Sequence, residues 1–281
     1  MKVGFWGLGS MGLGMARSLV RAGHDVAGHD PRGVVLDGAV AVAPEDMEAA
    51  VICVLNAAQT EAVLDGLIGA LPRGAVVVAC ATVPPAFARA QAARCAAAGL
   101  LYLDAPISGG AAKAAEGALS IMASGAPEAF DAARPVLDAC AETVFALGPE
   151  AGAGSAMKAV NQALAGVHVA AMAEAMVLGM SQGISPATVL EVIPRCAGTS
   201  WMLENRGPHV RDGDWAPRSA VDIWPKDLGI VREVAEAAGA ETPLVEAALA
   251  RFRAAQDAGL GAEDDAAVAK VYAAAAGIDL P

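Results

Sequence analysis

Three glycines near the start of the chain restrict the fold more than any other feature of the sequence. Gly7, Gly9 and Gly12 follow a short apolar run at residues 2–6 and fit the pattern G-x-G-x-x-G. In a dinucleotide-binding turn, the first glycine allows a tight turn after a strand, the second lets a pyrophosphate approach the backbone, and the third allows close helix packing. The motif therefore predicts a strand, a turn and a helix that bind a dinucleotide through the helix N-terminus. The same loop includes Leu8, Ser10 and Met11.

This segment has one alternative interpretation, a secretion signal, because Lys2 precedes small and apolar residues. A signal peptide needs an uninterrupted apolar core and a small-residue cleavage site. Glycines interrupt the apolar run here, and Arg17, Arg21 and His24 follow it. We therefore expect dinucleotide binding rather than export.

An acidic residue ends the predicted second strand, which covers residues 24–30. At the position of Asp30, a carboxylate accepts hydrogen bonds from the ribose hydroxyls of NAD and repels the extra phosphate of NADP. Arg32 keeps NADP open as an alternative, because a nearby arginine can pair with that phosphate. Asp30 makes NAD the predicted cofactor.

Strand-like runs recur through the first half of the chain, with alanine-rich helical stretches between most of them. They lie at residues 51–55, 75–80, 100–105, 118–124 and 143–148. Strands that alternate with helices indicate an α/β fold with a doubly wound, mostly parallel Rossmann-like sheet. The segment 156–182 has no proline and is apolar nearly all round, which indicates a long buried helix.

Beyond this helix the pattern is helical, with breaks expected at residues 185–186, 207–208 and 242–243. The predicted organisation is an NAD-binding domain at 1–152, a long interdomain helix at 153–184 and an all-helical domain at 185–281.

Composition excludes several classes of function. The chain has 19 basic and 31 acidic residues, a net charge of −12, which disfavours nucleic acid and anionic membranes as partners. We expect no membrane span. The five cysteines form no C-x-x-C pair, so neither a metal site nor a disulfide framework is indicated. Unpaired cysteines suit a reducing compartment, and we expect a cytoplasmic protein.

Two segments carry polar residues where ligands bind in such folds. Ser108, Gly109 and Gly110 follow the predicted strand at 100–105 and offer a hydroxyl and backbone N–H groups to a small carboxylate. Equally open is a plain glycine turn with the serine hydroxyl bonded to its own chain.

The second segment begins the long helix. Lys158, Asn161 and Gln162 share one helix face because they are spaced i, i+3 and i+4. They form either a solvated face, which is the usual arrangement near a helix start, or a polar site, and the apolar surroundings weaken the case for a solvated face. A lysine facing a cleft can exchange a proton with a substrate hydroxyl.

The segments GLGSMGLGMA, DAPISGG, GAGSAMKAVNQ and KDLGI occur in this order, and together they resemble the β-hydroxyacid dehydrogenases. That family includes 3-hydroxyisobutyrate dehydrogenase and tartronate semialdehyde reductase. Within it, VLNAAQ, SWMLENRGPHV and EDDAAV are similar to segments of the L-threonate dehydrogenases.

The resemblance implies a role for each candidate residue. Lys158 would be the catalytic lysine, Ser108 to Gly110 would hold the substrate carboxylate, and Asn161 would orient the substrate. The NAD site would also include Leu55, Asn56, Thr60, Thr82 and Lys226. Two residues depart from the commoner family pattern: Gln162 replaces an asparagine in the substrate site, and Asn56 replaces a proline near the nicotinamide.

The sequence thus predicts NAD-dependent oxidation of a small hydroxy acid, with L-threonate as the leading substrate. Alternatives are another 3-hydroxy acid, reduction of tartronate or succinic semialdehyde, imine reduction, and a non-catalytic NAD sensor. The family also implies a homodimer or homotetramer.

Overall fold

The structure is a computed structural model that describes all 281 residues. Its backbone contacts divide the chain into two compact units, Met1–Lys158 and Ala159–Pro281. The dividing point falls within one continuous helix, α6 (Ala153–Ser181). The three-part boundaries expected from the sequence stay a prediction.

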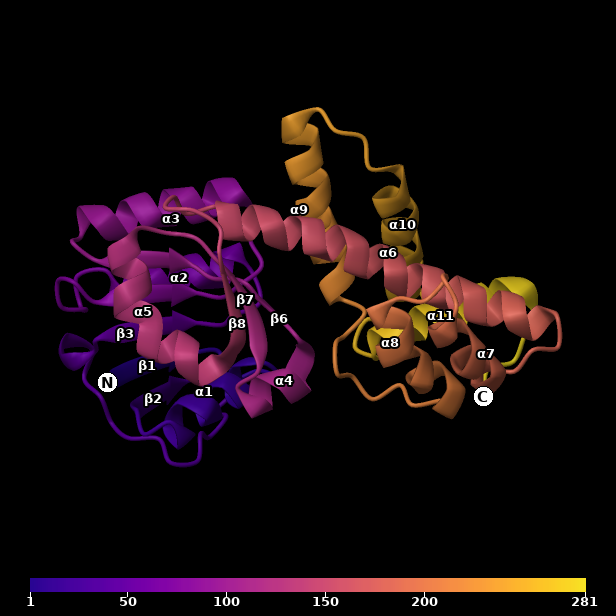
Figure 1. The fold of residues 1–281 in the computed structure, drawn as a ribbon, viewed down its shortest axis with the longest axis horizontal. Helices are drawn as coiled ribbons and strands as arrows, with labels where there is room; N and C mark the ends of the chain where they lie inside the picture. Colours follow the sequence, from indigo (N-terminus) through magenta and orange to yellow (C-terminus); the bar gives the residue numbers. More distant parts are fainter. The chain divides into compact units, whose positions relative to one another are not determined.

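A five-stranded parallel sheet forms the centre of the first unit (Figure 1). Its order is β2-β1-β3-β4-β5, and its strands are β1 (Lys2–Trp6), β2 (Asp25–His29), β3 (Ala49–Ile52), β4 (Val76–Ala79) and β5 (Leu101–Asp104). Every residue of β3 and β4 is buried. This explains why both strands read as continuous apolar runs, since a parallel sheet is covered on both faces.

Alternate residues of these strands enter different cores. Val51 and Val78 pack with helices α1 (Gly12–Arg21) and α5 (Pro127–Cys140). Ile52 and Val77 pack on the other face with α2 (Ala57–Leu67) and α3 (Pro85–Ala97). The predicted α/β fold is confirmed, with helices on both faces of the sheet.

A second, three-stranded sheet follows β5. It contains β6 (Ile107–Ser108), β7 (Leu119–Ala123) and β8 (Ala141–Ala146), with β6 antiparallel and β8 parallel to β7. Helix α4 (Gly110–Glu116) connects β6 to β7. The two-residue strand β6 was absent from the sequence prediction, because a strand this short has no periodicity of its own.

The second unit is helical throughout. Besides most of α6 it contains α7 (Pro186–Val192), α8 (Trp201–Asp212), α9 (Ile223–Ala238), α10 (Pro243–Asp257) and α11 (Val268–Ala276). Its core includes Met172, Met176 and Phe252. Breaks before α7 and α10 occur as predicted, at Pro186 and Pro243.

The break expected at residues 207–208 was wrong. Pro208 lies inside α8, which continues to Asp212. A proline removes one backbone hydrogen bond and usually ends a helix. Here the buried side chains of Leu203 and Val210 hold both halves of α8 in the core, so tertiary packing outweighs the local preference.

By length and composition alone, α6 could cross a membrane. The core helix of a soluble protein meets the same criteria, and 44% of the apolar window is buried in the structure. Val169, Met172 and Met176 belong to the core of the second unit. The helix is therefore weak evidence for a membrane span.

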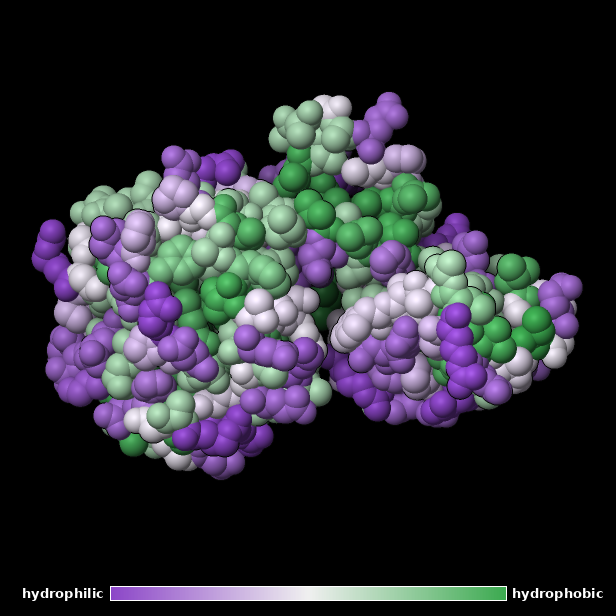
Figure 2. Space-filling view, viewed as in Figure 1, coloured by the Kyte–Doolittle hydropathy of each residue, from purple (hydrophilic) through white to green (hydrophobic).

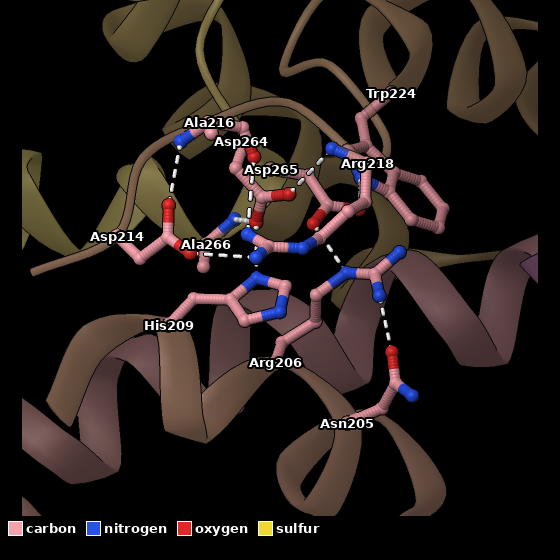
Figure 3. Close-up of polar contacts among 10 residues, drawn as sticks. All are labelled: Asn205, Arg206, His209, Asp214, Ala216, Arg218, Trp224, Asp264, Asp265 and Ala266. Atoms are coloured by element: carbon pink, nitrogen blue, oxygen red, sulfur yellow. Dashed lines mark hydrogen bonds and ion pairs between the residues drawn. The ribbon is translucent and has the colours of Figure 1, made fainter. Parts of the chain in front are cut away.

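Two adjacent buried aspartates connect the helices of the second unit (Figure 3). Asp265 accepts hydrogen bonds from Nε of Arg206 at 2.6 Å and Nε1 of Trp224 at 3.0 Å. Asp264 lies 2.8 Å from Nδ1 of His209. Burial raises the pKa of Asp265, with the Arg206 guanidinium acting in the opposite direction. The network joins α8 and α9 to the start of α11.

Candidate functional site

The loop between β1 and α1 is packed too tightly for a side chain at two of its glycines. Gly7 has a φ of +95°, and a Cβ there would lie 2.3 Å from the carbonyl oxygen of Cys53. A Cβ at Gly12 would lie 1.9 Å from the carbonyl oxygen of Gly7. Both positions therefore require glycine for the fold itself, as the motif predicted.

Gly9 differs from these two glycines. A Cβ at Gly9 would meet only Nη2 of Arg32, at 3.8 Å, which is an ordinary contact distance. Apart from the chain neighbours of Gly9, no other heavy atom lies within 4 Å of this Cβ position. In addition, no side chain caps the N-terminus of α1 at Met11. The loop thus has an open backbone approach and free N–H groups, which fit the pyrophosphate of a dinucleotide.

Asp30 follows β2 and lies against this loop. Its carboxylate accepts a hydrogen bond from the backbone N–H of Leu8 at 2.8 Å and two from the guanidinium of Arg32, at 2.9 and 2.8 Å. The Arg32 hydrogen bond is the largest cause that holds the pKa of Asp30 well below its usual range. Asp30 is therefore an anion whose side chain is only 3% exposed, while that of Arg32 is 63% exposed.

The residues expected near the ends of β3 and β4 lie before α2, in the first turn of α2 and after β4. Leu55 is exposed, and Asn56 caps α2 by accepting a hydrogen bond from the backbone N–H of Gln59 at 2.9 Å. Gln59 in turn accepts one from the N–H of Leu55 at 2.9 Å. Thr60 is buried and donates to the carbonyl of Asn56. Asn56 and Thr60 therefore shape the first turn of α2, and the half-buried Thr82 follows β4.

These loops converge for a topological reason. The strands β1 to β4 are parallel neighbours, so the segments that begin at Gly7, Asp30, Leu55 and Thr82 all leave the same edge of the sheet. The strand order switches side at β1, since β2 lies on one side of β1 and β3 lies on the other. Ligands of open α/β sheets bind at such a switch point.

The predicted carboxylate loop begins at Ser108, the last residue of β6. Gly109 and Gly110 have φ angles of +138° and +79°, which side-chain-bearing residues rarely adopt. The carboxylate site at Ser108–Gly110 stays a prediction, as does the alternative of a plain glycine turn.

Lys158 lies beside this loop. Its side chain is buried, with the residue 8% exposed, and Nζ donates a hydrogen bond to the carbonyl of Ile107 at 2.8 Å. Ile107 immediately precedes Ser108 in β6. The structure thus brings the candidate lysine and the candidate carboxylate loop together, and the solvated-face alternative for Lys158 is wrong.

The remaining candidates form a polar chain in the second unit. Asn161 Nδ2 donates to Gln162 Oε1 at 2.8 Å, and Gln162 Nε2 donates to Asp227 Oδ2 at 2.5 Å. Nζ of Lys226 lies 2.6 Å from the other carboxylate oxygen, Oδ1. Because the Gln162 side chain is one methylene longer than that of asparagine, its amide reaches Asp227. Asp227 was missed by sequence reasoning, although the Lys-Asp pair was visible.

Asp104 was also missed as a candidate. It ends β5 and is 1% exposed, and its carboxylate accepts hydrogen bonds from the first turn of α6. The DAPISGG segment contains it, but its partners are 48 and 51 residues away. No local spacing identifies such a pair.

Two family models match consecutive parts of the chain. One, described as the NAD binding domain of 6-phosphogluconate dehydrogenase, covers residues 2–148. The other, described as NAD-binding of NADP-dependent 3-hydroxyisobutyrate dehydrogenase, covers residues 152–272. The chain belongs to the 3-hydroxyisobutyrate dehydrogenase-like family. The resemblance found in the sequence is confirmed, and the protein is an NAD(P)-dependent hydroxyacid dehydrogenase.

Individual relatives of this dehydrogenase are similar over their whole length. L-threonate dehydrogenase of Cupriavidus necator is 48% identical, with 99% of this chain and 97% of the relative covered. L-threonate dehydrogenase of Escherichia coli K12 is 45% identical, with 99% and 96% covered. A crystal structure described as 3-hydroxyisobutyrate dehydrogenase from Salmonella typhimurium has a TM-score of 0.90 at 46% identity, and 96% of this chain and 99% of that chain are covered.

Proposed function

We propose that this dehydrogenase oxidises L-threonate with NAD, and that Lys158 is the general acid/base. The substrate follows from the full-length similarity to L-threonate dehydrogenases. One observation supports the chemistry: Nζ of the buried Lys158 lies 2.8 Å from the carbonyl oxygen of Ile107, next to Ser108.

The substrate carboxylate would bind to the segment Ser108–Gly110. Backbone N–H groups of the two successive glycines with positive φ would donate to the carboxylate, together with the Ser108 hydroxyl. Asn161 and Gln162, three and four residues after Lys158 in α6, would then hold the substrate hydroxyls. Asp227 would keep the Gln162 amide oriented, since it accepts the amide's hydrogen bond.

Proton transfer would take place at Nζ of Lys158. A bound nicotinamide cofactor would supply the hydride acceptor, and Lys158 in its neutral form would take the proton of the substrate hydroxyl as the carbinol carbon is oxidised. In the reverse direction its ammonium returns that proton to the nascent alkoxide. The carbonyl of Ile107 accepts a hydrogen bond from Nζ at 2.8 Å and so holds the amine beside Ser108.

The cofactor would extend along the sheet edge. Residues Gly7 to Gly12, with Leu8, Gly9, Ser10 and Met11 between them, would hold the pyrophosphate. Asp30 would bind the adenosine ribose, and Leu55, Asn56, Thr60, Thr82 and Lys226 would shape the nicotinamide side.

Asp30 is the reason to propose NAD rather than NADP. Its carboxylate is an anion at the place where the extra phosphate of NADP would bind. Binding NAD would require the ribose hydroxyls to replace Arg32, whose exposed side chain can move away. Substituting Asp30 with alanine while keeping Arg32 should therefore narrow the preference for NAD, measured as the ratio of kcat/KM for the two cofactors.

The assembly we propose is a homodimer or homotetramer in the cytoplasm. Met157, Val160 and Leu164 are 44%, 56% and 57% exposed and lie along one side of α6. Figure 2 shows further hydrophobic residues over α9 and α10. A second copy of the chain would cover such a surface. The five cysteines are all free, as expected in a reducing compartment.

The test is NADH formation with a panel of three- to five-carbon hydroxy acids. The panel includes both threonate enantiomers, glycerate and 3-hydroxyisobutyrate, each with NAD and with NADP. Turnover confined to L-threonate and NAD supports the proposal. Turnover of another acid, or reduction of a semialdehyde alone, would change the assigned substrate and leave the proposed role of Lys158 unchanged. NADH binding without any turnover would favour a sensor.

A further inference from the structure

Helix α6 begins at a buried carboxylate that belongs to another element. Asp104, the last residue of β5, accepts hydrogen bonds from the N–H of Gly152 at 2.9 Å and the N–H of Ser155 at 2.8 Å. It also accepts one from the Ser155 hydroxyl at 2.7 Å. A side chain from β5 thus satisfies the donors that normally stay free at a helix start.

Ser124 also holds the start of α6, and together with Asp104 it forms the anchor of this helix. It pairs with Asp104 in an antiparallel bridge, donates its hydroxyl to the Asp104 carboxylate at 3.3 Å and accepts the N–H of Gly154 at 2.9 Å. A Cβ at Gly154 would lie 2.3 Å from the carbonyl oxygen of Met122. The backbone at Gly154 therefore packs directly against β7, and only glycine fits at this position.

A buried carboxylate at position 104 costs free energy unless hydrogen bonds compensate for its loss of water. Burial raises the pKa of Asp104, against the four hydrogen bonds that favour the ionised form. Oδ2 accepts from two N–H groups and the Ser124 hydroxyl, and Oδ1 accepts from the Ser155 hydroxyl. An amide has only one accepting atom, so only a carboxylate accepts from all four. The positive end of the α6 dipole adds to its stability. The buried Asp104 carboxylate thus fixes the start of α6.

Lys158 follows this anchor by one turn of α6. Ser155 precedes it by three residues, so both side chains lie on the same side of the helix. The ammonium of Lys158 then meets the carbonyl of Ile107, three residues beyond Asp104. One short segment, Asp104–Ile107, thus holds both the start of α6 and the Lys158 side chain.

We propose that Asp104 is a positioning residue that sets the place of Lys158 through Ser155 and the first turn of α6. This inference rests on the proposed function, in which Lys158 transfers the proton. Proton transfer needs heavy atoms at hydrogen-bond distance, and a displacement of about 1 Å can lower a rate about a hundredfold.

The test compares Ser155→Ala with Asp104→Asn. Ser155→Ala removes one hydroxyl and keeps the backbone donors, so it should fold, and kcat should fall about tenfold with the NADH Kd unchanged. Asp104→Asn should lower kcat about a hundredfold. In both variants the apparent pKa that the kcat–pH profile gives for the proton-transferring group should shift. Ser155→Thr, which restores the hydroxyl, should recover kcat.

Ser200→Ala is the matched control. Ser200 caps α8 in the second unit by accepting the N–H of Leu203 at 3.1 Å, so its loss removes a similar helix cap far along the chain. This variant should lower the melting temperature and leave kcat and the pH profile at wild-type values. A purely structural role for Ser155 would give the same result in Ser155→Ala, and that outcome would overturn the inference.

A double-variant cycle separates this inference from the proposed function. If Ser155 acts through Lys158, then Ser155→Ala added to Lys158→Ala causes no further loss of the residual rate. Further loss by a full factor of about ten would contradict the inference. Wild-type turnover in Lys158→Ala alone would instead refute the proposed function.

Discussion

Replacing Gly9 with alanine separates ligand binding from folding in the glycine loop. A Cβ at Gly9 contacts only Arg32, at 3.8 Å, and the φ angle of Gly9 is not positive. Alanine therefore fits the folded chain, and lower entropy of the unfolded chain should leave stability unchanged or raise it by up to about 1 kcal/mol.

The same methyl group would occupy the space through which the pyrophosphate approaches the backbone. Losing one charge-assisted hydrogen bond to a phosphate oxygen costs about 2 kcal/mol, or about thirtyfold in Kd. Loss of two such bonds would exceed a hundredfold. We therefore expect Gly9→Ala to raise the NADH Kd by at least about thirtyfold in a fully folded protein.

Fluorescence titration with NADH measures this Kd, and calorimetric melting reports stability. Gly66→Ala is the control, because Gly66 lies exposed in α2 with no atom near its missing Cβ. It should stabilise the protein by about 1 kcal/mol and leave the NADH Kd unchanged. Gly12→Ala should destabilise the fold, since its Cβ would overlap a carbonyl oxygen. A wild-type Kd in folded Gly9→Ala would refute the reasoning.

Three further predictions concern other parts of the molecule. Arg206→Met leaves the buried Asp265 carboxylate without its guanidinium and should lower the free energy of unfolding by about 3–5 kcal/mol in urea, whereas a loss under about 1 kcal/mol would contradict the network. The lowered pKa of Asp30 means that its carboxylate stabilises the native state above its ordinary pKa and that this stabilisation is lost as the pH falls. The difference in unfolding free energy between wild type and Asp30→Asn should therefore shrink below about pH 4, and a constant difference would count against the ion pair. Gln162→Asn should no longer reach Asp227 and should raise the KM for L-threonate about tenfold without changing the NADH Kd, and an unchanged KM would exclude a role in substrate binding.

The first unit was predictable because its sequence signals are local. The requirement for glycine at Gly7 and Gly12 comes from the backbone a few residues away, and the apolar runs of β3 and β4 reflect burial on both faces. Local signals failed where tertiary packing decides. Pro208 continues a helix because buried neighbours on both sides hold it in place.

The candidate site was predictable as a set of motifs but not as a set of contacts. The helical spacing placed Lys158, Asn161 and Gln162 on one face, yet nothing local pointed to Ile107 or Asp227 as hydrogen-bond partners. Asp104 was missed for the same reason, because its partners lie far along the chain. Partners distant in sequence become visible only when the fold brings them together.

The role of Lys158 is tested most directly by one comparison of wild type with Lys158→Ala. In the same preparations, kcat for L-threonate oxidation is measured at saturating NAD, and the NADH Kd is measured by titration. A loss of kcat of at least about a hundredfold, with the Kd within about twofold of wild type, is the expected result. Turnover within a few-fold of wild type would contradict the assignment of proton transfer to Lys158.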